Sequence, residues 1–209
     1  MAVLVTGGAR SGKSRFAEAY AARLARRGIY VATAQPLDGE MASRIRSHRE
    51  ERIRSGFAWE TVEEPRDLAG LLDRLAAMAP DDATEQPEAA AGISPGRPVV
   101  LVDCLTLWLT NRLLALDPEG CADNGRVGRE LEAAIGELAG AAARFPHPLV
   151  LVTNEVGFGI VPETPLGRRF RDAAGRMNQR LAAVCDRVFL VVSGIPVELK
   201  AIACRLDPS

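Results

Sequence analysis

The stretch AVLVTGGARSGKS, residues 2–14, indicates how this chain folds. It opens with an apolar run typical of a buried strand and continues into the pattern G-x-x-x-x-G-K-S, from Gly7 to Ser14. An amphipathic segment follows, in which an apolar residue recurs every four positions from Phe16. A strand, a glycine-rich turn and a helix in this order predict a loop whose backbone N–H groups cradle phosphate.

Each residue type in this loop has a chemical reason to be there. Glycines let the backbone curl so that successive N–H groups point inward. Lys13 would reach the β- and γ-phosphates of a nucleotide, and the Ser14 hydroxyl would bind Mg²⁺. The alternative, a glycine-rich turn with an accidental Lys-Ser pair, agrees less well with the spacing and context. The candidate nucleotide contacts of the loop are Gly7, Gly8, Ala9, Arg10, Ser11, Gly12, Lys13 and Ser14.

Four further apolar runs predict strands that are buried on both faces, because they do not alternate with polar residues. With the first run, these strands are residues 2–5, 29–32, 99–102, 149–152 and 188–192. Helical patterns lie between them, and segments rich in Pro, Gly and acidic residues predict loops at 80–98 and 116–125. This alternation predicts a single α/β domain over residues 1–209, with a mostly parallel sheet flanked by helices.

Composition excludes several classes of protein. Twenty-six Lys and Arg against 27 Asp and Glu give a net charge of −1, which argues against a protein that coats nucleic acid or anionic membranes. No apolar run approaches the roughly 20 residues of a membrane span, and no basic leader precedes the first strand. The four cysteines and two histidines lack the local spacing of a zinc site. We therefore expect a reduced, cytoplasmic protein.

Asp103 and His48 are further candidates for chemistry. Asp103 ends the run VVLVD, where an acid could hold Mg²⁺ or simply form a turn or a helix cap. His48 lies in the arginine-rich segment 40–54, on one predicted helix face with Arg44 and Arg52. Two interpretations stay open for this segment: a solvated, salt-bridged helix, or an anion site whose imidazole attacks phosphorus. His147, between two prolines, is interpreted as structural.

Several stretches together resemble one known family. They include LVTGGARSGKSRFAE, HREER, VDCLTLWLTN, LVTNEVGFGIVPETPLGRRFRDAAGRMNQRLA and LVVSGIPVELK, which follow in order between residues 4 and 200. The chain is similar to the bifunctional adenosylcobinamide kinase / adenosylcobinamide-phosphate guanylyltransferase family of cobalamin biosynthesis. This resemblance implies a RecA-like P-loop NTPase fold and a homotrimer.

The resemblance also implies two reactions and their site. The kinase would phosphorylate the corrinoid adenosylcobinamide with ATP or GTP, and the transferase would move GMP from GTP onto that phosphate through a guanylylated His48. Ser14 and Asp103 would hold Mg²⁺. Beyond the loop, the implied nucleotide contacts are Ala32, Thr33, Ala34, Arg49, Glu50, Glu51, Arg52, Glu63 and Asp103.

Two alternatives differ from this interpretation in the chemistry they assign. One is a kinase-only phosphotransferase of small molecules, in which His48 is structural. The other is a non-enzymatic, nucleotide-gated binding protein of RecA-like fold.

Overall fold

The computed structural model describes residues 1–35, 39–78, 97–120 and 124–204, and these contain one seven-stranded sheet. The strand order is β3-β2-β4-β5-β1-β6-β7, and only β7 runs antiparallel to its neighbour. The strands are β1 (Ala2–Gly7), β2 (Arg27–Ala32), β3 (Ala58–Glu63), β4 (Val99–Asp103), β5 (Leu149–Val152), β6 (Arg187–Val192) and β7 (Ile195–Glu198). The helices are α1 (Lys13–Ala21), α2 (Gly39–Arg54), α3 (Leu68–Ala77), α4 (Leu105–Leu116), α5 (Asn124–Arg144), α6 (Pro165–Val184) and α7 (Leu199–Ile202).

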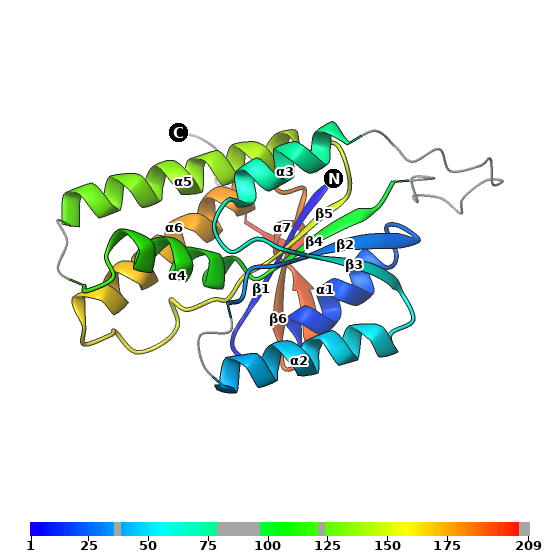
Figure 1. Cartoon of the computed structure of the whole chain (residues 1–209), viewed down its shortest axis with the longest axis horizontal. Coiled ribbons are helices and arrows are strands. Elements are labelled where there is room, and N and C mark those ends of the chain that lie inside the picture. The colour runs from blue at the N-terminus through cyan, green and yellow to red at the C-terminus, as the bar shows by residue number, and fades with distance from the viewer. Residues whose placement is uncertain (36–38, 79–96, 121–123, 205–209) are drawn as a thin grey trace.

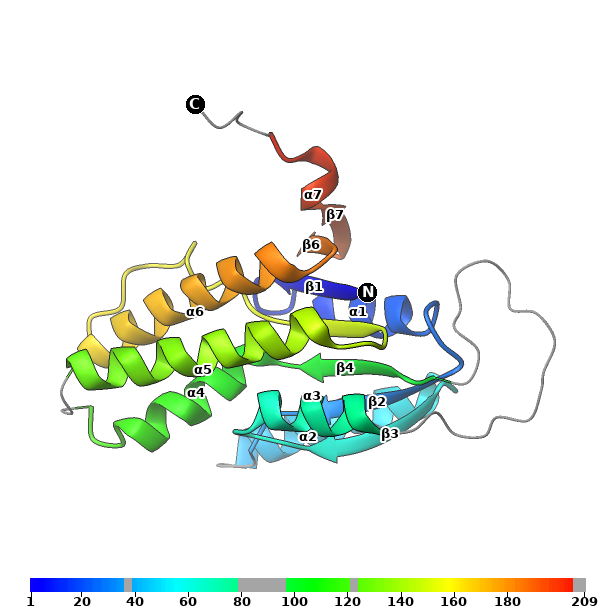
Figure 2. The same cartoon turned by 90° about the horizontal axis from the view of Figure 1, so that it is seen from above.

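Helices cover the sheet on both faces, as the parallel, non-alternating strands require. Helices α3, α4, α5 and α6 lie on one face, and α1 and α2 lie on the other (Figure 1; Figure 2). Two hydrophobic cores result. The larger packs α3–α6 against the sheet through residues such as Leu72, Leu109 and Leu138, and the smaller packs α1 through Ala17 and Ala21.

The five predicted strands and the mostly parallel sheet are confirmed. Two strands were not predicted, and both are at edges of the sheet. In β3, Trp59 and Val62 are partly covered while most of its residues face solvent, so its sequence lacks a continuous apolar run. The four-residue β7 is exposed over most of its length. These edge strands carry a weak hydrophobic signal because most of their side chains are exposed to solvent and need not be apolar.

The predicted loops need correction. Helices α3 and α4 were not predicted, although each buries an apolar stripe. The loop expected over 116–125 is shorter, because Leu116 ends α4 and α5 already begins at Asn124. The Arg126 guanidinium donates to the Leu116 carbonyl at 3.4 Å and links the two helices. Most of the loop expected over 80–98 lies outside the described residues.

The parallel strands place the phosphate-binding loop and Asp103 at the same end of the sheet, where the strands have their carboxyl ends. Strand β1 leads into the loop, β4 ends at Asp103, and β5 lies between them. A strand inserted between these two is the arrangement of RecA-like P-loop NTPases, so the expected fold is confirmed. In open parallel sheets, ligands bind outside the carboxyl ends of the strands.

Candidate nucleotide site

The phosphate-binding loop is a tight turn between β1 and α1. Gly12 has φ 91°, in the left-handed region that favours glycine, and a Cβ there would lie 3.2 Å from the Gly194 Cα. The Gly194 N–H donates to the Ser11 carbonyl at 2.8 Å. A Cβ at Gly7 would lie 2.5 Å from the Val191 carbonyl oxygen. The loop is thus shaped by its glycines and held from one side by the β6–β7 turn.

Lys13 is folded over the loop. It is buried at the start of α1, and its Nζ donates to the Gly8 carbonyl at 3.2 Å. Next to it, the buried Ser11 Oγ has no hydrogen-bond partner among the described residues. A buried polar atom without a partner is rare and requires an explanation, which a ligand would supply. The loop therefore offers an ammonium, a hydroxyl and the N-terminus of α1 to an anion.

The other predicted contacts line up across the carboxyl edge of the sheet. Ala32 is in register with Asp103 on one side and with Glu63 on the other. Parallel pairing alone brings together these three positions, which are separated by 31 to 71 residues along the chain. Their register places these three positions side by side at the carboxyl end of the sheet, and their contact with a nucleotide stays a prediction.

Thr33 fixes the backbone beside Asp103. Its buried Oγ1 donates to the Cys104 carbonyl at 2.7 Å and accepts from the Cys104 N–H at 2.9 Å. The Thr33 carbonyl accepts from Asn111 Nδ2 at 2.9 Å, and that amide also donates to the Pro65 carbonyl. The end of β4 is therefore tied to the end of β2 by a side chain with no freedom to turn. Burial and the neighbouring Asp103 raise the pKa of the Cys104 thiol, which keeps it neutral.

Acidic and basic groups from α1 and α2 meet near Asp103. Arg52 of α2 is buried, with its Cζ 3.6 Å from the centroid of the Tyr30 ring. Burial raises the pKa of Glu18 on α1 from 4.5 to about 7; Arg52 lowers it, and Asp103 and Glu51 raise it. Burial and Asp103 likewise raise the pKa of Tyr30 well above 10.

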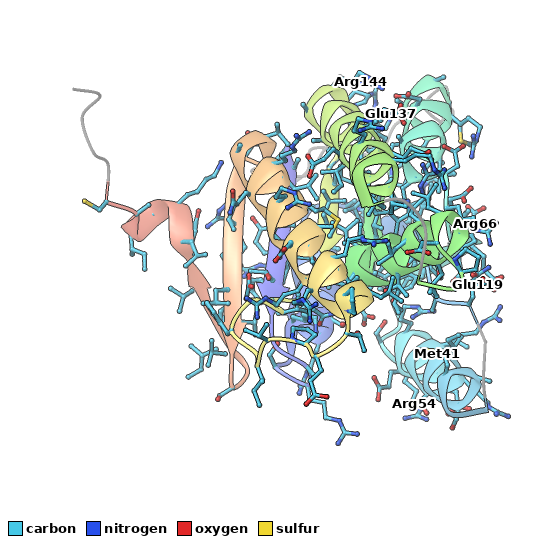
Figure 3. The ribbon with its side chains drawn as sticks, turned by 90° about the vertical axis from the view of Figure 1, so that its left-hand side faces the viewer. Met41, Arg54, Arg66, Glu119, Glu137 and Arg144 are labelled. Carbon is cyan, nitrogen blue, oxygen red and sulfur yellow. The ribbon has the colours of Figure 1, made fainter. Side chains whose placement is uncertain are left out.

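Helix α2 forms as predicted and carries His48, whose side chain lies outside the described residues. Its nucleophilic role therefore stays a prediction. Arg49, Glu50 and Glu51 are exposed, and Glu50 pairs with Arg54 at 3.2 Å, as in a solvated helix. Figure 3 shows Met41 and Arg54 of α2 on the opposite side of the molecule from Glu137 and Arg144 of α5.

Mg²⁺ is compatible with the residues at this edge. The described residues contain no group of three or more His, Cys, Asp or Glu side chains that could hold a metal by itself. Mg²⁺ is usually held by one or two protein oxygens, with waters and substrate phosphates completing its shell. The Ser14 hydroxyl and the Asp103 carboxylate are oxygen donors of this kind.

Residues outside this site have structural partners. His147 is buried, receives a hydrogen bond from Arg97 Nη1 to its Nδ1 at 3.0 Å, and packs edge-on against Phe145. Burial and the Arg97 charge lower the pKa of His147. Asn154 donates to Thr106 Oγ1 at 2.6 Å and so joins β5 to α4. The structural interpretation of His147 agrees with these contacts.

Sequence reasoning missed three residues of the site: Glu18, Tyr30 and Gly194. Glu18 had a signal, because an acid four positions after Ser14 lies on the same helix face. Gly194 also had one, since Ser-Gly between two apolar runs is typical of a hairpin turn. Tyr30 had none, because an aromatic residue within a buried strand is ordinary core.

The comparisons with known proteins cover almost the whole chain. The family model described as cobinamide kinase / cobinamide phosphate guanyltransferase matches residues 3–199. The bifunctional adenosylcobalamin biosynthesis protein CobU of Salmonella typhimurium is 48% identical over 96% of this chain and 100% of its own length. The protein of the same name from Escherichia coli is 45% identical over the same shares. CobP of Pseudomonas aeruginosa, also named a bifunctional adenosylcobalamin biosynthesis protein, is 44% identical over 94% of this chain and 96% of its own.

Proposed function

This chain belongs to the cobinamide kinase / cobinamide phosphate guanyltransferase family, and we propose that its two reactions share the nucleotide site at the carboxyl edge of the sheet. The observation that carries this proposal is the convergence of the loop, the buried Lys13 and the register row Glu63–Ala32–Asp103 on one edge. A site built from one phosphate-binding loop holds one nucleotide at a time, so the two reactions follow one another.

The kinase step uses ATP or GTP and adenosylcobinamide. Lys13, the loop N–H groups and the N-terminus of α1 bind the β- and γ-phosphates and stabilise their charge. The substrate hydroxyl oxygen attacks the γ-phosphorus, the bond to the bridging oxygen breaks, and a nucleoside diphosphate and a proton leave. Mg²⁺, held by Ser14 and Asp103, would supply further neutralisation of phosphate charge.

The guanylyl transfer is proposed to run through His48. A ring nitrogen attacks the α-phosphorus of GTP, the bond to the α–β bridging oxygen breaks, and pyrophosphate leaves. A phosphate oxygen of the corrinoid product of the kinase step then attacks the same phosphorus. The P–N bond breaks, GMP is transferred, and the imidazole is restored. The proposed contacts on α2 are Arg49, Glu50, Glu51 and Arg52. Those at the carboxyl ends of β2 and β3 are Thr33, Ala34 and Glu63.

Covalent labelling tests this proposal. The purified protein is incubated with GTP labelled at the α-phosphate, denatured, and assayed for acid-labile, base-stable label. We expect label in the wild type and in His147→Gln, the matched control at the other histidine, and none in His48→Ala. Phosphorylation of adenosylcobinamide without any covalent label would leave a kinase only. Failure of both reactions would leave a nucleotide-binding protein.

We also propose that the protein is a cytoplasmic homotrimer. Within the described part of the chain, no helix has the length and apolar character needed to cross a membrane.

Exposed apolar side chains gather on the β6–β7 hairpin and α7, where Ile195 is 66% and Ile202 70% exposed. Ile160, in the loop before α6, is 95% exposed. Such surfaces are typical of subunit contacts. Sedimentation equilibrium should give three times the chain mass, and Ile195→Glu should lower it; a native monomer would contradict the proposal.

A further inference from the structure

The three residues after β5, which we call the segment 153–155, lie beside the first residue of the phosphate-binding loop. The Thr153 N–H donates to the Val5 carbonyl at 2.9 Å, and the Glu155 N–H donates to the Gly7 carbonyl at 3.1 Å. These bonds continue the parallel pairing of β5 with β1 beyond the end of β5. The loop is therefore held from two sides, by the β6–β7 turn on one and by this segment at Gly7 on the other.

The same segment is also joined to the residues that follow Asp103. Asn154 Nδ2 donates to Thr106 Oγ1 at 2.6 Å, and this oxygen lies 3.1 Å from the Cys104 Sγ. Thr106 and Cys104 are both buried. Because β5 lies between β1 and β4 in the sheet, the segment connects the strand end that carries the loop with the strand end that carries Asp103.

Asn178 of α6 holds this segment from one face of the sheet (Figure 2). Only 9% of Asn178 is exposed, and Thr153 is completely buried. Asn178 Oδ1 accepts from Thr153 Oγ1 at 2.8 Å, and Asn178 Nδ2 donates to the Asn154 carbonyl at 3.2 Å. A backbone carbonyl can only accept a hydrogen bond, so these contacts fix the orientation of the Asn178 amide. Both polar atoms of one side chain are thus bonded to two consecutive residues of the segment.

Loss of the Asn178 amide would release this segment. The Thr153 hydroxyl and the Asn154 carbonyl would lose these partners in the interior, where unpaired polar groups are costly and turn toward water or another partner. Either change shifts the segment, and the Glu155 N–H transmits the shift to Gly7. A loop that is not already held in its bound conformation binds its ligand more weakly, because binding must then order it.

We propose that Asn178 is a positioning residue for the nucleotide, which acts through the segment 153–155 to hold the phosphate-binding loop and the end of β4 in their binding arrangement. This inference rests on the proposed nucleotide site. It gives a role to residues of the stretch LVTNEVGFGIVPETPLGRRFRDAAGRMNQRLA, residues 151–182, which contains Asn178 and both of its partners.

Nucleotide affinity tests this role in two variants of α6. The probe is the GTP analogue with a methylene group between the α- and β-phosphates, which cannot guanylylate His48, and its Kd with Mg²⁺ is measured by calorimetry. Asn178→Ala removes the amide, and Leu181→Ala, three positions further along α6, truncates a completely buried apolar residue as the matched control.

We expect the Kd to rise about tenfold in Asn178→Ala, or about 1.4 kcal/mol, which is comparable to the net contribution of one hydrogen bond. In Leu181→Ala it should stay within twofold, although the lost core contacts lower the urea midpoint. A Kd within twofold of the wild type in Asn178→Ala would overturn the proposal. So would an equal rise in both variants, because general loosening of α6 would then be the cause.

A second pair of variants decides if Asn178→Ala does not fold. Thr153→Val keeps the shape of the side chain but removes the hydroxyl that donates to Asn178 Oδ1, whereas Thr153→Ser keeps the hydroxyl and loses a methyl group. We expect the Kd of the analogue to rise at least threefold in Thr153→Val and to stay within twofold in Thr153→Ser. Equal Kd values in these two variants would overturn the proposal.

Hydrogen exchange without nucleotide separates this inference from the proposed function. The Glu155 amide reports on its own bond to Gly7, and the Leu101 amide in the centre of β4 reports on global unfolding. We expect the protection of Glu155 to fall about tenfold in Asn178→Ala and to stay unchanged in Leu181→Ala, where Leu101 loses protection. If the wild type does not bind the analogue, the proposed function fails, and exchange still decides: unchanged protection of Glu155 in Asn178→Ala overturns the role of Asn178.

Discussion

Replacing Thr33 with Val tests how the edge of the sheet is held together. Val keeps the shape of Thr but removes the Oγ1 that exchanges two hydrogen bonds with the Cys104 backbone, at 2.7 and 2.9 Å. Thr33 is completely buried, so no water replaces the lost partner. The Cys104 N–H is left unpaired, at about 1–3 kcal/mol, while the Cys104 carbonyl still accepts from the Leu107 and Trp108 N–H groups at 3.2 Å and loses one of its bonds, at about 1 kcal/mol. The expected total is about 2–4 kcal/mol.

The matched control is Thr33→Ser, which keeps the hydroxyl and loses one buried methyl group, at about 1 kcal/mol. Urea unfolding without nucleotide measures both free energies, because a lost ligand contact does not contribute there. For a chain of this length, the free energy lost in Thr33→Val corresponds to a fall in Tm of about 4–16 °C, and that lost in Thr33→Ser to a fall of about 2–4 °C. If Thr33→Val unfolds at the same urea concentration as Thr33→Ser, the hydroxyl does not hold Cys104, and this reasoning is refuted.

Three further predictions concern the loop, pH and a buried ion pair. Lys13→Ala should reduce nucleotide binding below detection in calorimetry with an unchanged circular dichroism spectrum; normal turnover would remove the loop from the mechanism. The pKa of His147 is lowered in the folded state, so the unfolded chain binds this proton first as pH falls below about 6.5, and the free energy of unfolding decreases there. The unfolding midpoint of His147→Gln should therefore vary less between pH 7 and 5 than that of the wild type. An equal pH dependence of the two midpoints would contradict this. Asp117 pairs with Arg169 while 2% exposed, so Asp117→Asn should cost about 3 kcal/mol in chemical denaturation. Asp73→Asn, which breaks an exposed pair, should cost less than about 1 kcal/mol, and similar losses would argue against a burial effect.

Local pattern was enough to predict much of the fold. The five buried strands can be recognised in the sequence because a strand covered on both faces must be apolar throughout. The phosphate-binding loop is equally local, since all of its residues are contiguous and its glycines are required by its own backbone. Edge strands β3 and β7 were not predicted because most of the residues in each are exposed to solvent.

The candidate site was only partly accessible to the same reasoning. Asp103 was a candidate because it ends the run VVLVD, and Glu63 because of the resemblance. Their place beside Ala32 follows from strand register, which no local pattern states. The arginine-rich helix left two interpretations open because spacing shows which residues share a face and not what that face meets. The solvated interpretation is wrong for Arg52, which is buried on Tyr30. The expectation of a single domain over the whole chain stays a prediction.

By itself, the sequence determined the phosphate-binding loop, the α/β alternation and the family, because each depends on residues that are neighbours along the chain. The tertiary structure decided which residues from distant parts of the chain lie near the phosphate-binding loop. Parallel pairing places the ends of β2, β3 and β4 side by side, and the packing of α2 puts the Arg52 guanidinium over the Tyr30 ring, 22 positions away along the chain. Burial also sets the charge behaviour there, since it raises the pKa of the Glu18 carboxyl from 4.5 to about 7.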